Sequence, residues 1–166
     1  MEEKPEAFYQ VKIVVDTNIV FSCILNSTGG IGKILLTSKN YLQFYSVEFL
    51  KTELLKHRSK LLKRTRLEPQ ELDELQSYVT ANITFINEQL IPQHAFQSAE
   101  NLLKNIDPDD TPFVALATHL KTKLWTGDKA LYDRLKAKGF NNIISTSELL
   151  LLLDKLERKS KRREKK

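Results

Sequence analysis

A short run of β-branched residues that ends in an aspartate constrains this chain more than any other feature. Residues 12–18 read Lys-Ile-Val-Val-Asp-Thr-Asn, and Ile13 to Val15 have the pattern of a strand that is buried on both faces. Such a strand belongs in the centre of a parallel sheet. Ligands bind beyond the carboxyl ends of parallel strands, so we expect Asp16 either to act at a functional site or to cap the following turn.

Strand and helix patterns alternate along the rest of the chain. Further strands are predicted at residues 41–45, 82–86, 123–126 and 142–144, with helical patterns between them. This alternation predicts an α/β fold in which helices cover both faces of a parallel sheet. With 166 residues, the chain is long enough for one such domain and too short for two to be expected.

Three residues are predicted to begin helices. Ser46 is placed to cap a single helix that starts at Val47 and whose apolar stripe continues to Leu61, and Thr111 to cap a helix whose first residue is a proline. Ser145 and Glu148 form the pattern of a capping box before a final helix. The helix that follows Thr111 is apolar on all sides, which predicts that it is buried.

The positive charge is concentrated at the C-terminus. The chain has 26 Lys and Arg against 21 Asp and Glu, but residues 155–166 alone contain eight basic and two acidic side chains. We predict a short lead at residues 1–10, one folded domain at 11–154, and a tail at 155–166 that is frayed or disordered because it has little to bury. The tail is either an arm that binds phosphates or only a solubilising terminus.

Composition also indicates where in the cell the protein is expected. A single cysteine, Cys23, cannot form an internal disulfide, and the acidic first residues lack the apolar core of a signal peptide. No apolar run approaches the roughly 18 residues of a membrane span. We therefore expect a soluble, cytoplasmic protein with no membrane partner.

Four acidic residues are candidates for one site. Asp16 and Asp128 each end a predicted strand, Glu53 lies on the flank of an apolar helical stripe, and Asp110 precedes the buried helix, whose N-terminus stabilises a carboxylate. If the four converge, their repulsion raises their pKa values unless a cation intervenes. Carboxylate ligands favour Mg²⁺ or Mn²⁺, and the histidines are scattered without ligand spacing.

The segments that carry these acids together resemble the PIN-domain ribonucleases, including VapC-type toxins. The matching segments are Val14-Val15-Asp16-Thr17-Asn18, the helix with Glu53, the stretch from Asp107 to Ala117, and Trp125-Thr126-Gly127-Asp128-Lys129-Ala130-Leu131. The resemblance covers about residues 11–150. It implies a five-stranded parallel sheet of order 3-2-1-4-5, in which the strands that end at Asp16 and Asp128 are neighbours.

The resemblance also implies an activity and its residues. Members hydrolyse phosphodiester bonds, mostly of single-stranded RNA, with Mg²⁺ or Mn²⁺, and many are toxins of toxin–antitoxin pairs. The metal-binding and catalytic positions match Asp16, Glu53, Asp110 and Asp128, and the polar residues that support them match Thr17, Asn18 and Thr126. Expected partners are RNA, an antitoxin protein and a second copy of the chain.

Basic side chains beside the acids would hold the RNA phosphates, and Lys33, Arg58 and Lys129 are the candidates. The alternative is a non-catalytic module that binds RNA or protein with the same fold. A phosphotransferase of the haloacid-dehalogenase kind needs a second aspartate two positions after Asp16, where this chain has Asn18.

Overall fold

The computed structural model describes residues 9–166, and its centre is a five-stranded parallel sheet with strand order β3-β2-β1-β4-β5. The predicted sheet and its order are confirmed. The strands are β1 (Val11–Val15), β2 (Leu42–Val47), β3 (Ile83–Ile86), β4 (Lys123–Trp125) and β5 (Ile143–Ile144).

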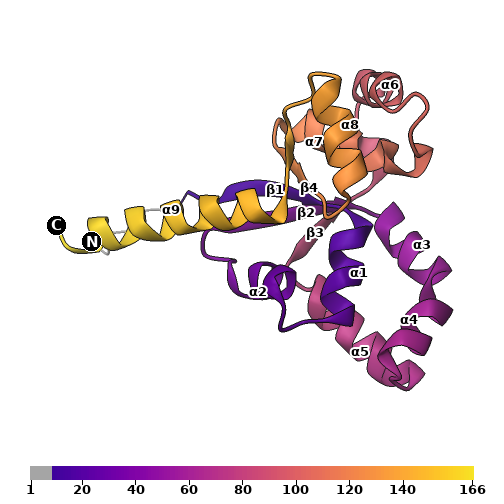
Figure 1. Ribbon diagram of the computed structural model, residues 1–166, viewed down its shortest axis with the longest axis horizontal. Helices are drawn as coiled ribbons and strands as arrows, with labels where there is room; N and C mark the ends of the chain where they lie inside the picture. The colour runs from indigo at the N-terminus through magenta and orange to yellow at the C-terminus, as the bar shows by residue number, and fades with distance from the viewer. Residues whose placement is uncertain (1–8) are drawn as a thin grey trace.

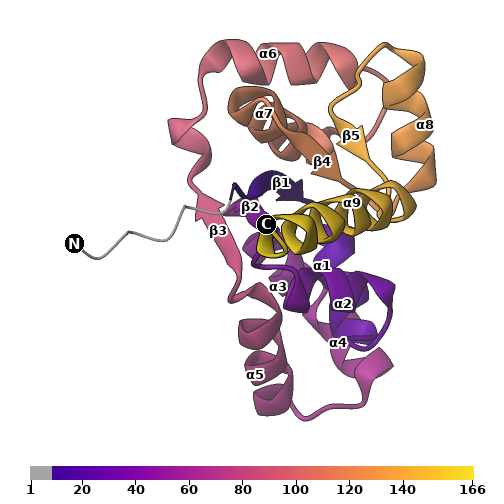
Figure 2. The same ribbon diagram turned by 90° about the vertical axis from the view of Figure 1, so that its left-hand side faces the viewer.

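Helices cover both faces of this sheet. They are α1 (Thr17–Leu25), α2 (Gly30–Thr37), α3 (Phe49–Lys56), α4 (Arg58–Thr65), α5 (Pro69–Thr80), α6 (Gln93–Leu102), α7 (Thr111–Leu120), α8 (Lys129–Ala137) and α9 (Thr146–Glu164), with short 3₁₀ turns η1 (Glu88–Leu90) and η2 (Pro108–Asp110). Figures 1 and 2 show α6, α7 and α8 on one face and α1 to α5 on the other. The core lies between the sheet and these two layers.

The first strand is the centre of the sheet, as its sequence predicts. Its residues Ile13, Val14 and Val15 are buried, and parallel neighbours pair with it on both sides, β2 and β4. The chain order reverses between these neighbours, so the end of β1 is a topological switch point. Asp16 is the next residue, and its N–H donates to the carbonyl of Trp125 at 3.4 Å.

The helix α1 follows β1 directly and was not predicted. Its β-branched residues Ile19 and Val20 have low intrinsic helix propensity, but both are fully buried. Asp16 caps the helix, because its Oδ1 accepts a hydrogen bond from the Ile19 N–H at 2.9 Å. Burial and the cap therefore outweigh the local preference for extended structure.

Ser46 does not cap a helix, so that prediction is wrong. It lies inside β2, and its buried hydroxyl donates to the carbonyl of Val15 at 2.6 Å. The helix α3 begins three residues later, at Phe49. The predicted single helix is also two helices, since α3 ends at Lys56 and α4 begins after His57.

The later helix starts agree more closely with the sequence. Thr111 is the first residue of α7 rather than its cap, because η2 places Asp110 at the cap position. The predicted burial of this helix is confirmed, with Phe113 to Ala117 all buried. The capping box of α9 is present, since Ser145 Oγ accepts from the Glu148 N–H at 3.2 Å and Glu148 Oε1 accepts from the Ser145 N–H at 3.3 Å.

The basic C-terminal segment differs from its prediction as a frayed or disordered tail. It forms the second half of α9, which continues to Glu164, and Figure 1 shows this half extending beyond the rest of the molecule. Leu149 and Leu153 anchor the first half in the core. Within residues 9–166 no single helix is long and apolar enough to cross a membrane, although α1 and α2, bent by 107°, pass that test as a pair.

Candidate active site

The four predicted acids line one cavity of about 400 Å³ at the carboxyl edge of the sheet. Each comes from a different element: Asp16 from the end of β1, Glu53 from α3, Asp110 from the start of α7 and Asp128 from the start of α8. The strand order brings the ends of β1 and β4 side by side, and the helix N-termini point at the same edge. The predicted convergence of the four is confirmed, whereas their catalytic roles stay a prediction.

Asp16 is the most buried of the four, with 3% of its surface exposed. Its Oδ1 caps α1, while its Oδ2 has no hydrogen-bond partner within the described part of the chain. Burial raises the pKa of Asp16 from 3.8 to about 6, the Thr126 hydroxyl and the Ile19 N–H oppose this rise, and the charges of Asp128 and Glu53 add to it. A buried oxygen without a partner costs free energy, so Oδ2 is available for a cation.

Asp110 and Asp128 lie at the N-termini of α7 and α8, where each is the residue just before the helix. Burial raises the pKa of Asp110 to about 7, and the negative charge of Asp16 is the next largest cause. Asp128 Oδ1 caps α8 by accepting from the Leu131 N–H at 3.1 Å. The hydroxyl of Thr126, which is buried, accepts from the Asp128 N–H at 3.0 Å and thereby fixes the turn that carries this acid.

Glu53 is held by a side chain from α1. The Thr17 hydroxyl donates to Glu53 Oε1 at 2.6 Å, which places the carboxylate in the cavity and leaves Oε2 outside this bond. Burial raises the pKa of Glu53, the Thr17 hydrogen bond opposes the rise, and the charge of Asp109 adds to it. Asn18 also lines the cavity, as an exposed residue at the start of α1.

Two acids of this cavity were missed as site residues, although both belong to the segment that the sequence singled out. Asp107 and Asp109 line the same cavity as Asp110. Asp107 caps η2, since its Oδ1 accepts from the Asp109 N–H at 3.0 Å. A 3₁₀ turn places successive side chains on different sides, and the sequence alone did not show that all three would reach one cavity.

The side chains that line the cavity are of the chemical type that binds a hard cation. Carboxylate oxygens dominate the cavity, one of them is buried without a partner, and mutual repulsion and burial raise three of the pKa values. Such a donor set suits Mg²⁺ or Mn²⁺. The side chains are not drawn together around a point, since no group of three or more Asp, Glu, His or Cys in residues 9–166 has the spacing of a formed metal site.

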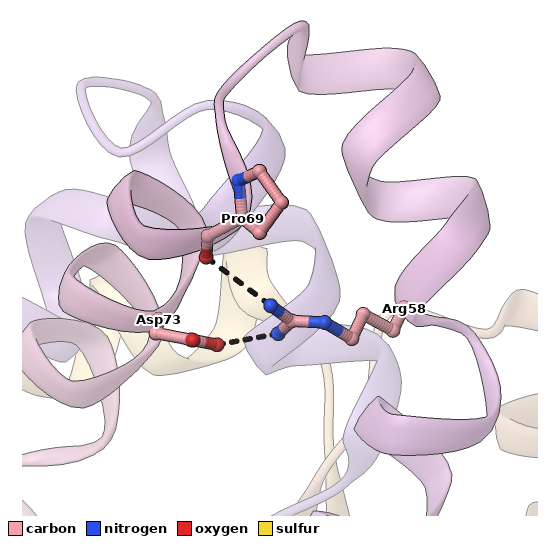
Figure 3. Close-up of polar contacts among 3 residues, drawn as sticks. All are labelled: Arg58, Pro69 and Asp73. Carbon is pink, nitrogen blue, oxygen red and sulfur yellow. Dashed lines mark hydrogen bonds and ion pairs between the residues drawn. The ribbon is translucent and has the colours of Figure 1, made fainter.

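The three basic residues predicted to lie beside the acids do not line this cavity, so that placement is wrong. Arg58 binds Asp73 and the carbonyl of Pro69 on α5 instead (Figure 3). Lys129 pairs with Asp133 at 3.0 Å. Lys33 lines a separate cavity between α2 and α9.

Different basic residues border the acids. Lys56, His57 and Arg134 line the cavity, from the end of α3, the joint before α4 and the last turn of α8. A signal for two of them exists in the sequence: Lys56 and His57 lie three and four residues after Glu53, and neighbours on a helix surface are three or four residues apart. His57 also packs edge-to-face against Phe21 at 6.4 Å between ring centroids.

A parallel α/β sheet with an acid-lined cavity at its switch point defines a class of possible hydrolases and binding proteins. A family model described as the PIN domain matches residues 14–148, so the chain belongs to the PIN domain family. Members of this family are in general nucleases, and such nucleases in general use divalent metals.

Two solved structures share the fold. A chain of VapBC2 from Rickettsia felis, solved bound to a DNA fragment from its promoter, is similar with a TM-score of 0.62 and 15% identity, over 81% of this chain and 97% of that one. PAE2754 from Pyrobaculum aerophilum is similar with a TM-score of 0.63 and 12% identity, over 90% and 94%. At these identities the likeness shows the fold alone. A comparison with curated proteins finds no match.

Proposed function

We propose that this protein is an endoribonuclease that uses Mg²⁺ or Mn²⁺ to hydrolyse phosphodiester bonds of single-stranded RNA. The observation that carries the proposal is Asp16, a buried carboxylate with one unpartnered oxygen at the switch point of the sheet, with three further acids around it. Membership of a family of nucleases supports hydrolysis. The choice of RNA follows from the resemblance to PIN-domain ribonucleases, and the choice of Mg²⁺ or Mn²⁺ follows from the carboxylate donors.

The four acids would have different roles in hydrolysis. Asp16, Asp110 and Asp128 would hold the cation, and the raised pKa values of Asp16 and Asp110 measure how unfavourable their charges are without it. A bound divalent ion supplies a water of lowered pKa and stabilises charge on the leaving oxygen. Because Thr17 occupies Oε1 of Glu53, Oε2 is the atom that would orient a water or accept its proton.

Basic residues at the rim of the cavity would hold the substrate. Six acids in one cavity repel a polyanion, so RNA needs positive charge beside them, and Lys56 and Arg134 are placed to supply it, with His57 as a further hydrogen-bonding side chain. These side chains would contact phosphates and set the register of the RNA without reading its sequence. Cleavage would therefore depend on salt.

The likeness to a VapBC2 chain supports a second part of the proposal, an antitoxin protein that binds this chain and blocks its activity. A second copy of the chain is a further candidate partner.

The test is Asp16→Asn. This change removes one charge from the cavity and keeps an oxygen to cap α1, so the fold should persist while Mn²⁺-dependent cleavage of single-stranded RNA falls by about a thousandfold or more. The matched control is Asp133→Asn, the same change at an exposed residue of α8 outside the cavity. Full activity of Asp16→Asn would refute the assignment and favour a non-catalytic module.

A further inference from the structure

A second surface of this protein is strongly basic and lies at the other end of the sheet. A cavity of about 620 Å³ is formed where β1, β4 and β5 begin, and three exposed lysines line it. The acid cavity lies where the strands end, so the five residues of β1 separate the two by roughly 16 Å at 3.3 Å per residue.

The helix α9 continues this surface. Leu152 lines the cavity, and Lys155 and Lys159 follow it by three and seven residues, which places them on the same face of the helix. Arg162 lies seven residues after Lys155 on that face. We call the combined surface the basic edge, and it consists of Lys12, Lys121, Lys123, Lys155, Lys159 and Arg162.

Three of the four acids of α9 lie away from this face. Asp154 and Glu157 line the cavity that α9 forms with α2, on the other side of the helix, and Glu164 follows Glu157 by seven residues. The fourth, Glu148, is in the first turn of the helix, where it forms the capping box with Ser145. None of the six basic residues forms an ion pair with any residue in the range 9–166. The charge of the basic edge is therefore not neutralised by the acids of its own helix.

We propose that the basic edge binds the phosphate backbone of RNA at a site separate from the acid cavity. The inference rests on the proposed function for its substrate class. The basic face of α9 from Lys155 to Arg162 is about 10 Å long at 1.5 Å per residue, and with the strand lysines it spans several phosphates. RNA long enough to pass from one end of the strands to the other contacts both sites, whereas a short oligonucleotide contacts only one.

A membrane surface fits this helix less well than RNA. A helix that lies on a membrane buries its apolar face in the lipid, but Leu149 and Leu153 of α9 are already buried in the protein core. The basic half beyond them offers little apolar surface: its only leucine, Leu156, is itself partly buried against the core. Leu150 and Leu151 of the first half are exposed, but two side chains do not make the apolar face of a membrane-bound helix, so the main attraction here is to charge, as a phosphate backbone requires.

The test compares two variants of α9 with the same composition. The edge variant is Lys155→Gln with Lys159→Gln, and the outer-face variant is Lys161→Gln with Lys165→Gln. Both lose two lysines, and glutamine keeps the helix propensity of the residues that it replaces. Circular dichroism and thermal unfolding check that both variants fold.

Binding of a single-stranded RNA of about 30 nucleotides is measured by fluorescence anisotropy in EDTA over a series of salt concentrations. For the edge variant we expect about tenfold weaker binding near 0.1 M salt, and a slope of log Kd against log salt that is shallower by about 1.4, since each lost phosphate contact removes about 0.7. The outer-face variant should change the slope by less than half as much. Equal slopes in the two variants would overturn the proposal.

Two further measurements make the result specific. The double variant Lys121→Gln with Lys123→Gln should bind the same RNA more weakly although α9 is unaltered. Unchanged affinity of this variant would also overturn the proposal. Polyglutamate that displaces the RNA at equal charge concentration would instead identify a site for an acidic protein, and binding of anionic phosphatidylserine vesicles in preference to RNA would identify a membrane site.

The design separates this inference from the proposed function. Binding in EDTA needs no cleavage, so the basic edge can be confirmed even if Asp16→Asn remains active. In the reverse case, cleavage is lost in Asp16→Asn while the edge variant binds RNA normally, and only the basic edge is refuted. For the edge variant, KM should rise for the long RNA and stay unchanged for a hexanucleotide, with kcat the same for both.

Discussion

Asp16→Asn should make the metal-free protein more stable at high pH. Asp16 is fully buried, and a pKa that rises from 3.8 to about 6 on folding corresponds to about 3 kcal/mol of lost stability once the carboxyl is ionised in both states. Because the folded pKa is the higher one, stability is retained at low pH and lost as the pH rises from about 4 to about 6 and beyond. By pH 5 about half of this loss has occurred, and by pH 8 all of it has.

The asparagine variant lacks this dependence. Its amide leaves a buried donor near the Thr126 hydroxyl, at a cost of about 1 to 2 kcal/mol that is the same at every pH. The variant should therefore match the wild type near pH 5 and exceed it by about 1 to 2 kcal/mol at pH 8. Loss of the Asp16 charge also lowers the pKa of Asp110, which acts in the same direction.

The assay is urea unfolding in EDTA at pH 5 and pH 8. The chain has one tryptophan, Trp125, which is fully buried at the end of β4 and reports unfolding by its fluorescence. Added Mn²⁺ should stabilise the wild type at pH 8 and have much less effect on the variant, by mass action. A variant that gains no stability relative to wild type between pH 5 and pH 8 would refute the electrostatic reasoning.

Two other substitutions test the geometry of the cavity. Thr17→Val removes the donor to Glu53 at nearly constant volume, so the pKa of Glu53 should rise further. The acidic limb of the pH–rate profile should then move to higher pH, and activity at neutral pH should be about tenfold lower. An unchanged profile would show that Thr17 has no part in catalysis. Arg134→Gln, at the cavity, should raise KM for RNA by about tenfold. Arg58→Gln, which removes the contacts with Asp73 and the Pro69 carbonyl, should leave KM unchanged, and the reverse order would restore the placement expected from sequence.

The sheet and the acid cavity could be predicted because they depend on local patterns. Three β-branched residues before Asp16 identify a buried strand, and the chain order of strands and helices then determines which strand ends meet. A proline after Thr111 and a serine before Glu148 locate helix starts to within a residue. Each of these patterns involves residues that are close in sequence.

The errors concern contacts between distant residues. The hydroxyl of Ser46 bonds the neighbouring strand at Val15, 31 residues away, and Arg58 turns to Asp73, 15 residues away, instead of to the acids. Neither hydrogen-bond partner can be predicted from local sequence, since tertiary packing decides which groups come within reach. For Arg58 the many rotamers of a long side chain add to the uncertainty. The second half of α9 is helical because the anchored first half supplies the nucleus that an isolated basic segment lacks.

One carboxylate here serves two unrelated demands, because Oδ1 of Asp16 holds the first turn of α1 while Oδ2 faces the cavity without a partner. A substitution at this position can therefore impair the helix cap, the cavity or both. Alanine would remove both functions together, whereas asparagine would remove only the second and keep the cap. Relatives that lose nuclease activity but keep the fold should accordingly carry asparagine here more often than an apolar residue, and an alignment of inactive members would show it.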